Sequence, residues 1–248
     1  MFGPIAKKNV HVRQPESKLD SGAPFKPKAI RAGDSVALLS DAIAIYELDS
    51  ALQSIRSNPR YTQNITYGRP RKGHPEGSVG AHIQELHQNL AVVAAYCRDR
   101  GSPLSDADLK RLEILIEVHD TFKGEAKKRV PIADPESHAS IARAFLASIH
   151  PEKSLLDMIQ LHDLPYSLHL QTKRFGDFNV ARFDDLLSLI PNIELFAIFQ
   201  IIDNTTKGKV KPGEVGPVEW FISELKVRGI SPKLDLFAMR QKVEDSLR

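Results

Sequence analysis

The chain has 248 residues, of which 42% are hydrophobic and 26% charged, so it can bury a core in one large domain or two small ones. Its 34 Lys and Arg residues against 31 Asp and Glu give a net charge of +3, which is too balanced to require a nucleic-acid partner. A single cysteine, Cys97, excludes an internal disulfide framework, and no apolar run approaches the roughly 18 residues of a membrane span, so we expect a cytoplasmic protein with no membrane partner.

Three segments differ in composition. Residues 1–33 carry four prolines and scattered basic residues without periodicity, which predicts a flexible N-terminal arm. Over residues 34–208 apolar side chains recur at helical spacing and no strand pattern is present, so we predict an all-α domain. Residues 209–248 contain a Gly/Lys/Pro-rich turn and two short helices, which we expect to pack on the same domain. Trp220 and Phe221 in this extension could complete the core or form the face of a homodimer.

Capping residues and prolines set the expected helix boundaries. Asp34, Ser105 and Asp134 are the expected N-caps of three helices, and residues 61–77 and 165–180 are expected to be irregular. The expected helices cover residues 35–56 (in one or two pieces), 78–98, 105–119, 135–149, 152 to before Pro165, 183–190, 193–203, 218–228 and 234–247.

The segment 112–125 is the most informative stretch. Its apolar run ends in adjacent His119 and Asp120, and Lys123 follows three positions later. Imidazole and carboxylate both bind borderline divalent metals, and a lysine at i+3 lies on the same helical face, from which its ammonium could reach a metal-bound phosphate. His-Asp pairs also occur by chance at helix ends, so this segment predicts a metal site only if other potential ligands elsewhere in the chain accompany it.

Four other potential ligands lie at or near the end of an apolar helical stripe: His82, His138, His162 and Asp203. His82 is on the inner stripe of its helix, and His138 is in the first turn of its own. Asp203 ends a strongly apolar helix, where an isolated carboxylate would be too costly to bury. His87, one step off its stripe, is expected to be an ordinary core histidine. The candidate metal ligands are His82, His119, Asp120, His138, His162 and Asp203.

The order of these residues resembles that of the HD superfamily of metal-dependent phosphohydrolases, over about residues 73–208. Residues 73–82 (GHPEGSVGAH) are similar to the first-histidine motif of that family in the version of bacterial tRNA nucleotidyltransferases. Residues 118–124 resemble the signature His-Asp-x-x-Lys, with Thr-Phe where an aliphatic residue and Gly are usual, and 201–208 resemble the closing Asp motif. The resemblance implies an HD-type helical bundle with a metal site between helices. No nucleotidyltransferase catalytic domain precedes the motif, so we do not expect tRNA end addition.

The resemblance leaves the number of metal ions open. Short variants of the family bind one ion through the first histidine, the His-Asp pair and the closing aspartate, whereas members with two further histidines bind two. His138 and His162 occupy the places of that extra pair, although Asp163 could be the functional group there, with His162 only capping its helix. Mn, Fe, Co, Ni and Zn all suit a mixed His/Asp site.

With two ions, Asp120 is the natural bridging ligand, because a carboxylate has two oxygens and an imidazole offers one nitrogen. Two ions can activate a water and hold phosphoryl oxygens, and Lys123 would neutralise the charge that develops there. If the basic loop before the first histidine borders a cleft, it would bind an anionic substrate through Arg69, Arg71 and Lys72; otherwise it is a solvated surface loop, and we favour the cleft. The expected function is therefore hydrolysis of a nucleotide or another small phosphate ester.

Two other functions fit the same residues. Some HD-fold proteins with six such ligands hold a di-iron centre and use dioxygen to cleave C–P or C–C bonds of an anionic substrate. A non-catalytic sensor that binds a nucleotide is the third reading, and the complete ligand set argues against it. We do not expect nucleic-acid binding, because the basic residues lie mostly around the expected cleft and no aromatic platform accompanies them.

Overall fold

The computed structural model describes residues 32–210 and 214–247, and within them the chain is all-α, as predicted. No β-strand forms in these residues, although two isolated bridges, Gly68–Ser78 and Arg71–His74, shape the loop before α3 (Val79–Asp99). The expected arm at residues 1–33 lies outside the described residues except for its last two, which begin α1 (Ala32–Ser57).

Most helices begin at a residue whose side chain accepts a hydrogen bond from the first turn. Ser105 caps α4 (Asp106–Val118), as the sequence predicted, and Ser78, which was expected to be the first residue of its helix, caps α3. The remaining helices are α2 (Pro59–Asn64), the 3-10 helix η1 (Thr121–Gly124), α5 (His138–Ala147), α6 (Lys153–Leu161), α7 (Leu164–Phe175), α8 (Val180–Leu189), α9 (Ile193–Asn204), α10 (Pro217–Val227) and α11 (Leu236–Ser246).

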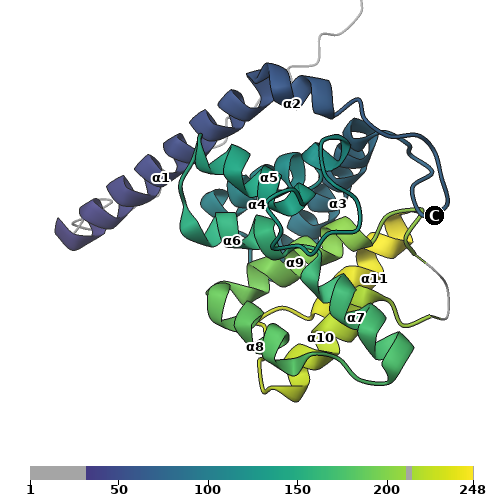
Figure 1. Ribbon diagram of the computed structural model, residues 1–248. Coiled ribbons are helices and arrows are strands. Elements are labelled where there is room, and N and C mark those ends of the chain that lie inside the picture. Colours follow the sequence, from purple (N-terminus) through teal and green to yellow (C-terminus); the bar gives the residue numbers. More distant parts are fainter. Residues whose placement is uncertain (1–31, 211–213, 248) are drawn as a thin grey trace, which may run out of the picture.

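Helices α4 and α9 form the centre of the molecule (Figure 1). The side chains from Ile114 to Ile116 are fully buried, and every residue from Leu195 to Asp203 is buried as well. Helix α4 packs against α1, α3, α6 and α9, while α9 also packs against α10 and α11. Helix α9 is apolar on nearly all sides and therefore has to be surrounded, whereas α4 is buried mainly over its C-terminal half, so the candidate ligands lie at the ends of both helices.

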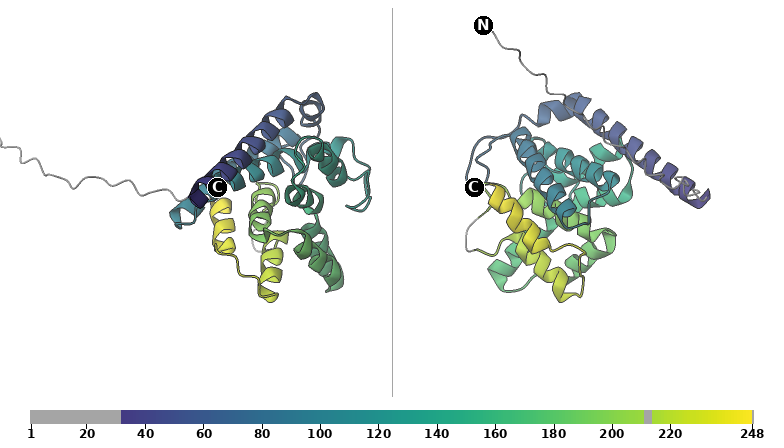
Figure 2. Two further views of the ribbon diagram at one scale, coloured as in Figure 1. Left: turned by 90° about the vertical axis from the view of Figure 1, so that its left-hand side faces the viewer. Right: turned by 180° about the vertical axis from the view of Figure 1, so that it is seen from behind.

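Helix α1 is continuous, and among its described side chains, from residue 39 on, those in the core lie in its C-terminal half. Leu48, Leu52 and Ile55 are buried, whereas Leu39 and Ile43, which the sequence places on the same stripe, are 62% and 50% exposed. Figures 1 and 2 show α1 running past the body of the protein. The apolar spacing predicted the helix correctly. It did not predict which part of the helix is buried, because that depends on how far its partner α4 extends beside it.

Several boundary predictions were wrong. Asp34 is not the N-cap of α1, because that helix begins two residues earlier, at Ala32. Residues 165–180 are not irregular: α7 covers the first part, with Pro165 in its first turn, where the missing N–H costs nothing, and Gly176 ends it in the left-handed region at φ 76°. Ser137, not Asp134, caps α5, because the Asp134 carboxylate accepts from the Glu136 N–H before the helix begins. The expected loop 61–77 begins later, since Tyr61 lies in α2.

The C-terminal helices pack on the rest of the chain. Helix α10 contacts α7 and α9, and α11 contacts α3 and α9 (Figure 2). Trp220 and Phe221 are buried, which places both side chains in the core. Among the described helices none is by itself long and apolar enough to cross a membrane; α8 and α9 reach that length and composition only as a pair bent by 112°.

Candidate metal centre

Asp120 lies at the centre of the site, between the end of α4 and η1. Its Oδ2 atom is 3.5 Å from His119 Nε2 and 3.9 Å from His82 Nε2. Its other oxygen, Oδ1, is 3.6 Å from His138 Nε2 and 3.5 Å from His162 Nε2. The two oxygens of one carboxylate therefore face two separate groups of imidazoles.

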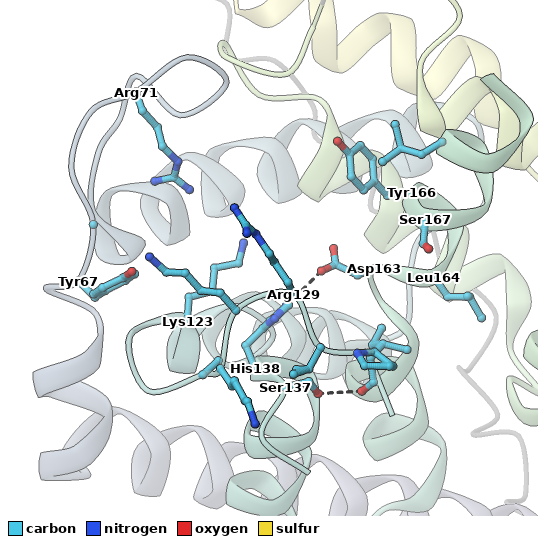
Figure 3. Close-up of a pocket in the computed structure, with 18 of the residues that line it drawn as sticks. Tyr67, Arg71, Lys123, Arg129, Ser137, His138, Asp163, Leu164, Tyr166 and Ser167 are labelled. Atoms are coloured by element: carbon cyan, nitrogen blue, oxygen red, sulfur yellow. Dashed lines mark hydrogen bonds and ion pairs between the residues drawn. The ribbon is translucent and has the colours of Figure 1, made fainter. Parts of the chain in front are cut away.

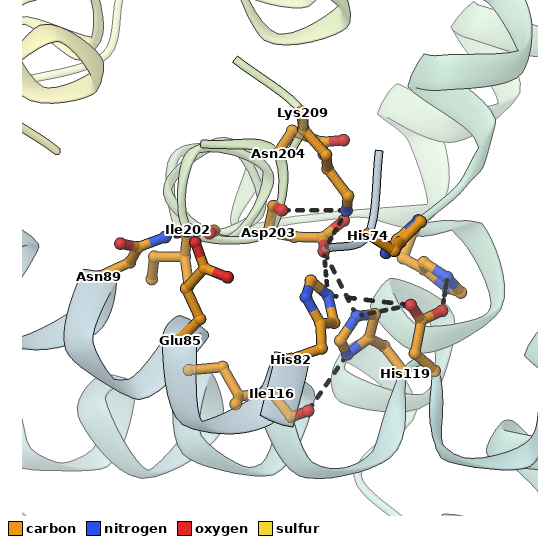
Figure 4. A network of polar contacts seen from close by, with 12 residues as sticks. His74, His82, Glu85, Asn89, Ile116, His119, Ile202, Asp203, Asn204 and Lys209 are labelled. Atoms are coloured by element: carbon orange, nitrogen blue, oxygen red, sulfur yellow. Dashed lines mark hydrogen bonds and ion pairs between the residues drawn. The ribbon is translucent and has the colours of Figure 1, made fainter. Parts of the chain in front are cut away.

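The first group joins the beginning of α3, the end of α4 and the end of α9 (Figure 4). Asp203 Oδ1 is 3.0 Å from His82 Nε2 and 3.5 Å from His119 Nε2, and all three residues are buried. Lys209 follows α9 and places its Nζ 2.8 Å from the same carboxylate oxygen. The buried acid that ends the most apolar helix is thus paired, as its burial requires.

The second group comes from α5 and the turn between α6 and α7. His138 is the first residue of α5, His162 follows the last residue of α6, and their Nε2 atoms are 3.2 Å apart. Asp163 also belongs to this group, because its carboxylate is 3.2 Å from His138 Nε2 and 3.7 Å from His162 Nε2. The structure thus brings together both of the alternatives that the sequence left open at this position.

Backbone acceptors orient two of the imidazoles. His119 Nδ1 is 3.0 Å from the Leu115 carbonyl oxygen, and His162 Nδ1 is 2.7 Å from that of Ile159. A ring whose Nδ1–H donates to a carbonyl presents the lone pair of Nε2 on its other side, which is the tautomer that a metal ligand needs. The helix ends therefore set both the position and the orientation of these rings.

Glu76 lies beside a third ring, that of His82, and was not among the predicted site residues. Its Oε1 lies 3.4 Å from His82 Nδ1 and 2.9 Å from His74 Nδ1. This leaves His82 Nε2 to face Asp203 and Asp120. The signal for Glu76 was its place in the segment 73–82, six positions before the histidine, but the loop that folds it back could not be read from helical spacing.

The buried atoms of the site fit a cation. Within the described residues, His119 Nε2 and Asp120 Oδ1 are buried without any hydrogen-bond partner. Unpaired buried polar atoms are costly and rare, and one divalent ion beside each would satisfy them. Nitrogen and oxygen ligands in this mixture suit a transition metal. His82, His119 and Asp203 could hold one ion and His138, His162 and Asp163 another, with Asp120 between them.

The charges of the site favour positive charge at its centre. Burial alone would lower the pKa of His119, but the Asp120 and Asp203 carboxylates outweigh it and raise that pKa to about 10. Burial would raise the pKa of Asp120, yet Lys123 and His119 hold it well below its usual range. The carboxylates are therefore ionised at neutral pH, and their negative charge favours a cation among these residues.

A cavity of about 1380 Å³ opens beside the second group, where His138 and Asp163 form part of its wall (Figure 3). Arg69, Arg71 and Lys123 line it, as expected for substrate-binding residues. Lys72 does not line it and is exposed, because the bridge between Arg71 and His74 makes Lys72 part of a tight turn. The expected role of Lys72 is therefore not supported.

A second cavity, of about 20 Å³, lies between His82, Asp120 and Lys123, and has room for a single water. The Lys123 ammonium donates to Asp120 Oδ2, and both Lys123 and Arg71 line the small cavity and the large one. These two cations therefore stand between the candidate metal ligands and the space where a substrate would enter.

The structure brings the six predicted ligands together and places Lys123, Arg69 and Arg71 beside them, but not Lys72. No protein-family model, no curated protein and no solved structure matches the chain. The reading of the site therefore depends on its own residues and on the motifs in the sequence.

Proposed function

We propose that the chain is a metal-dependent phosphohydrolase or phosphodiesterase with an HD-type helical domain over residues 34–208, acting on a nucleotide or another small phosphate ester. The observation that carries the proposal is the position of Asp120, whose two carboxylate oxygens each face a pair of histidines within 3.9 Å. A carboxylate between two sets of imidazoles is suited to bridge two ions, and two neighbouring ions suit the displacement of a phosphoryl group.

The bound ions would polarise the phosphoryl oxygens and lower the pKa of a water. The protein contributes the rest of the chemistry. Lys123, beside Asp120 at the junction of the two cavities, would neutralise the charge that develops on the phosphoryl group, and Arg71 would hold it from the opposite loop. Burial of His82, His119 and Asp203 excludes bulk water from that side, which strengthens each of these charge interactions.

The test is the metal content of protein purified without added metal, together with hydrolysis of bis(p-nitrophenyl) phosphate and of nucleoside monophosphates. We expect about two ions per chain, and fewer ions with no hydrolysis in both His119→Ala and His162→Ala. One ion, lost in His119→Ala but kept in His162→Ala, would contradict the binuclear site and leave a mononuclear hydrolase. Absence of any bound metal, also after titration, would refute the proposal.

The same ligand set also suits iron, which gives the second candidate. Four histidines with carboxylates are compatible with a di-iron centre, and the surrounding cations would attract an anionic substrate in either case. An iron-loaded, coloured protein that consumes dioxygen and releases no phosphate from any ester would replace the hydrolase with the oxygenase.

A further inference from the structure

The large cavity carries more positive charge than one phosphate group at the metal centre requires. Seven Lys and Arg side chains line it against a single carboxylate, Asp163. Lys123 pairs with Asp120 and Lys127 with Glu136. The other five face no carboxylate within 4 Å in the described part of the chain. They are Arg69, Arg71, Lys128, Arg129 and Arg182.

Arg129 stands out among them because of its backbone. Its φ of 66° places it in the left-handed region, and it is the one residue other than glycine with a positive φ in the described segments. A side chain with a Cβ adopts this conformation at a cost, and such strain is typically retained where a side chain has to be aimed. In Figure 3 the Arg129 side chain extends into the same space as Arg71 and Lys123.

The walls of the cavity also offer aromatic surface. Tyr67 and Tyr166, on opposite sides of the cavity, are 41% and 46% exposed, and Leu170 is 45% exposed (Figure 3). Small-molecule sites combine apolar surface with a few polar anchors, and the volume here exceeds what a phosphate group alone would fill. A nucleotide could use both kinds of wall residue: its base would lie between the tyrosine rings, and its phosphate groups would lie among the Lys and Arg side chains.

We propose that Lys128 and Arg129, together with Arg182 of α8, which lines the same cavity, form a second anion subsite that binds a phosphate group other than the one at the metal centre. The ligand class is thus a nucleotide with at least two phosphate groups. The planar guanidinium of Arg129 would bind that group through two parallel hydrogen bonds, which a lysine cannot do. The second subsite itself does not depend on the proposed function. Only the position of the other phosphate group, at the metal centre, rests on it.

The test compares adenosine 3′,5′-bisphosphate with adenosine 5′-monophosphate by calorimetry on the metal-loaded protein. We expect the bisphosphate to bind at least about tenfold more tightly, since hydrogen bonds to charged groups have effects of this order. Arg129→Asn should abolish this advantage and change monophosphate affinity less than about threefold, because asparagine tolerates the left-handed conformation. Lys242→Asn, which removes an exposed charge from α11, should change neither affinity.

Equal affinity of the wild-type protein for the two nucleotides would overturn the subsite. So would an Arg129→Asn variant that weakens both nucleotides by the same factor, because that result indicates a diffuse field of charge. Arg129→Gly, which relieves the backbone strain, should behave as Arg129→Asn does, so misfolding of one variant leaves a second measurement. Binding requires no turnover, so the proposed hydrolysis can fail while the advantage of the bisphosphate persists.

Discussion

Glu117 connects four helices and lies two residues before His119, the candidate metal ligand at the end of α4. Its buried carboxylate accepts from Arg56 Nη2 at 2.7 Å and from the Tyr61 hydroxyl, and lies 3.0 Å from His87 Nε2. Burial alone would raise the pKa of Glu117, but His87, Tyr61 and Arg56 together lower it from 4.5 to about 2. Arg56 lies in α1, Tyr61 in α2 and His87 in α3, so this carboxylate fixes all three to α4.

We expect Glu117→Gln to lower the free energy of unfolding at pH 7 by about 2 to 3 kcal/mol. A pKa change from 4.5 to about 2 corresponds to about 3 kcal/mol, and the half-exposed Arg56 side chain argues for the lower part of the range. Because the pKa is lower in the folded state, the contribution is complete above pH 4.5 and is lost as the pH falls toward 2. Urea unfolding at pH 7 and pH 3 measures both values.

The control for this prediction is Glu113→Gln on the same helix. Glu113 is 3.8 Å from Arg56 and more exposed than Glu117, so its loss should lower stability by less than about 1 kcal/mol. The difference between wild type and Glu117→Gln should shrink by about half or more at pH 3. A difference that is the same at both pH values would refute the assignment of this stabilisation to the Glu117 charge.

Three further predictions concern the site and the core. Metal affinity should rise with pH up to about 10, because the raised pKa of His119 means that an ion has to displace a proton from it; calorimetry in buffers of different ionisation enthalpy should show that proton released. Arg71→Asn should raise the KM for a phosphodiester about tenfold, since Arg71 lines both cavities, whereas Lys72→Asn in the same loop should change it less than twofold. Leu52→Ala should lower the free energy of unfolding by about 2 to 4 kcal/mol, whereas Ile43→Ala on the exposed part of α1 should lower it by less than about 1 kcal/mol, both measured by urea unfolding.

The clustering of the candidate ligands could be predicted because each lies at or near the end of an apolar helical stripe. In α4 and α9 the apolar pattern fixes which residues are buried, so His119 and Asp203 have to lie at buried ends that other helices meet. Periodicity alone could not decide between His162 and Asp163, which are adjacent, and the structure turns both toward His138. The six candidate ligands and the central place of Asp120 were thus readable from the sequence, and the choice between His162 and Asp163 was not.

The errors occurred where local signals compete. Asp134 and Ser137 are both good N-caps three residues apart, and the choice depends on Ser137, whose hydroxyl accepts from the Ser140 N–H. Pro165 was read as the end of a helix, although a proline fits equally well in the first turn of the next one. The burial of α1 depends on the length of α4 beside it, which is a property of another part of the chain.

The position of Glu76 shows how the loop before α3 and the metal site depend on each other. The loop is closed by the Gly68–Ser78 bridge, where Gly68 has a φ of 116° and an added Cβ would lie 2.4 Å from the Gly77 carbonyl oxygen. That closure returns Glu76 to His82 Nδ1 and places Arg71 at the mouth of both cavities. One glycine-dependent turn thus brings Glu76 beside a candidate metal ligand and Arg71 to the lining of both cavities, so the basic residues of this loop lie next to the imidazoles of the helices.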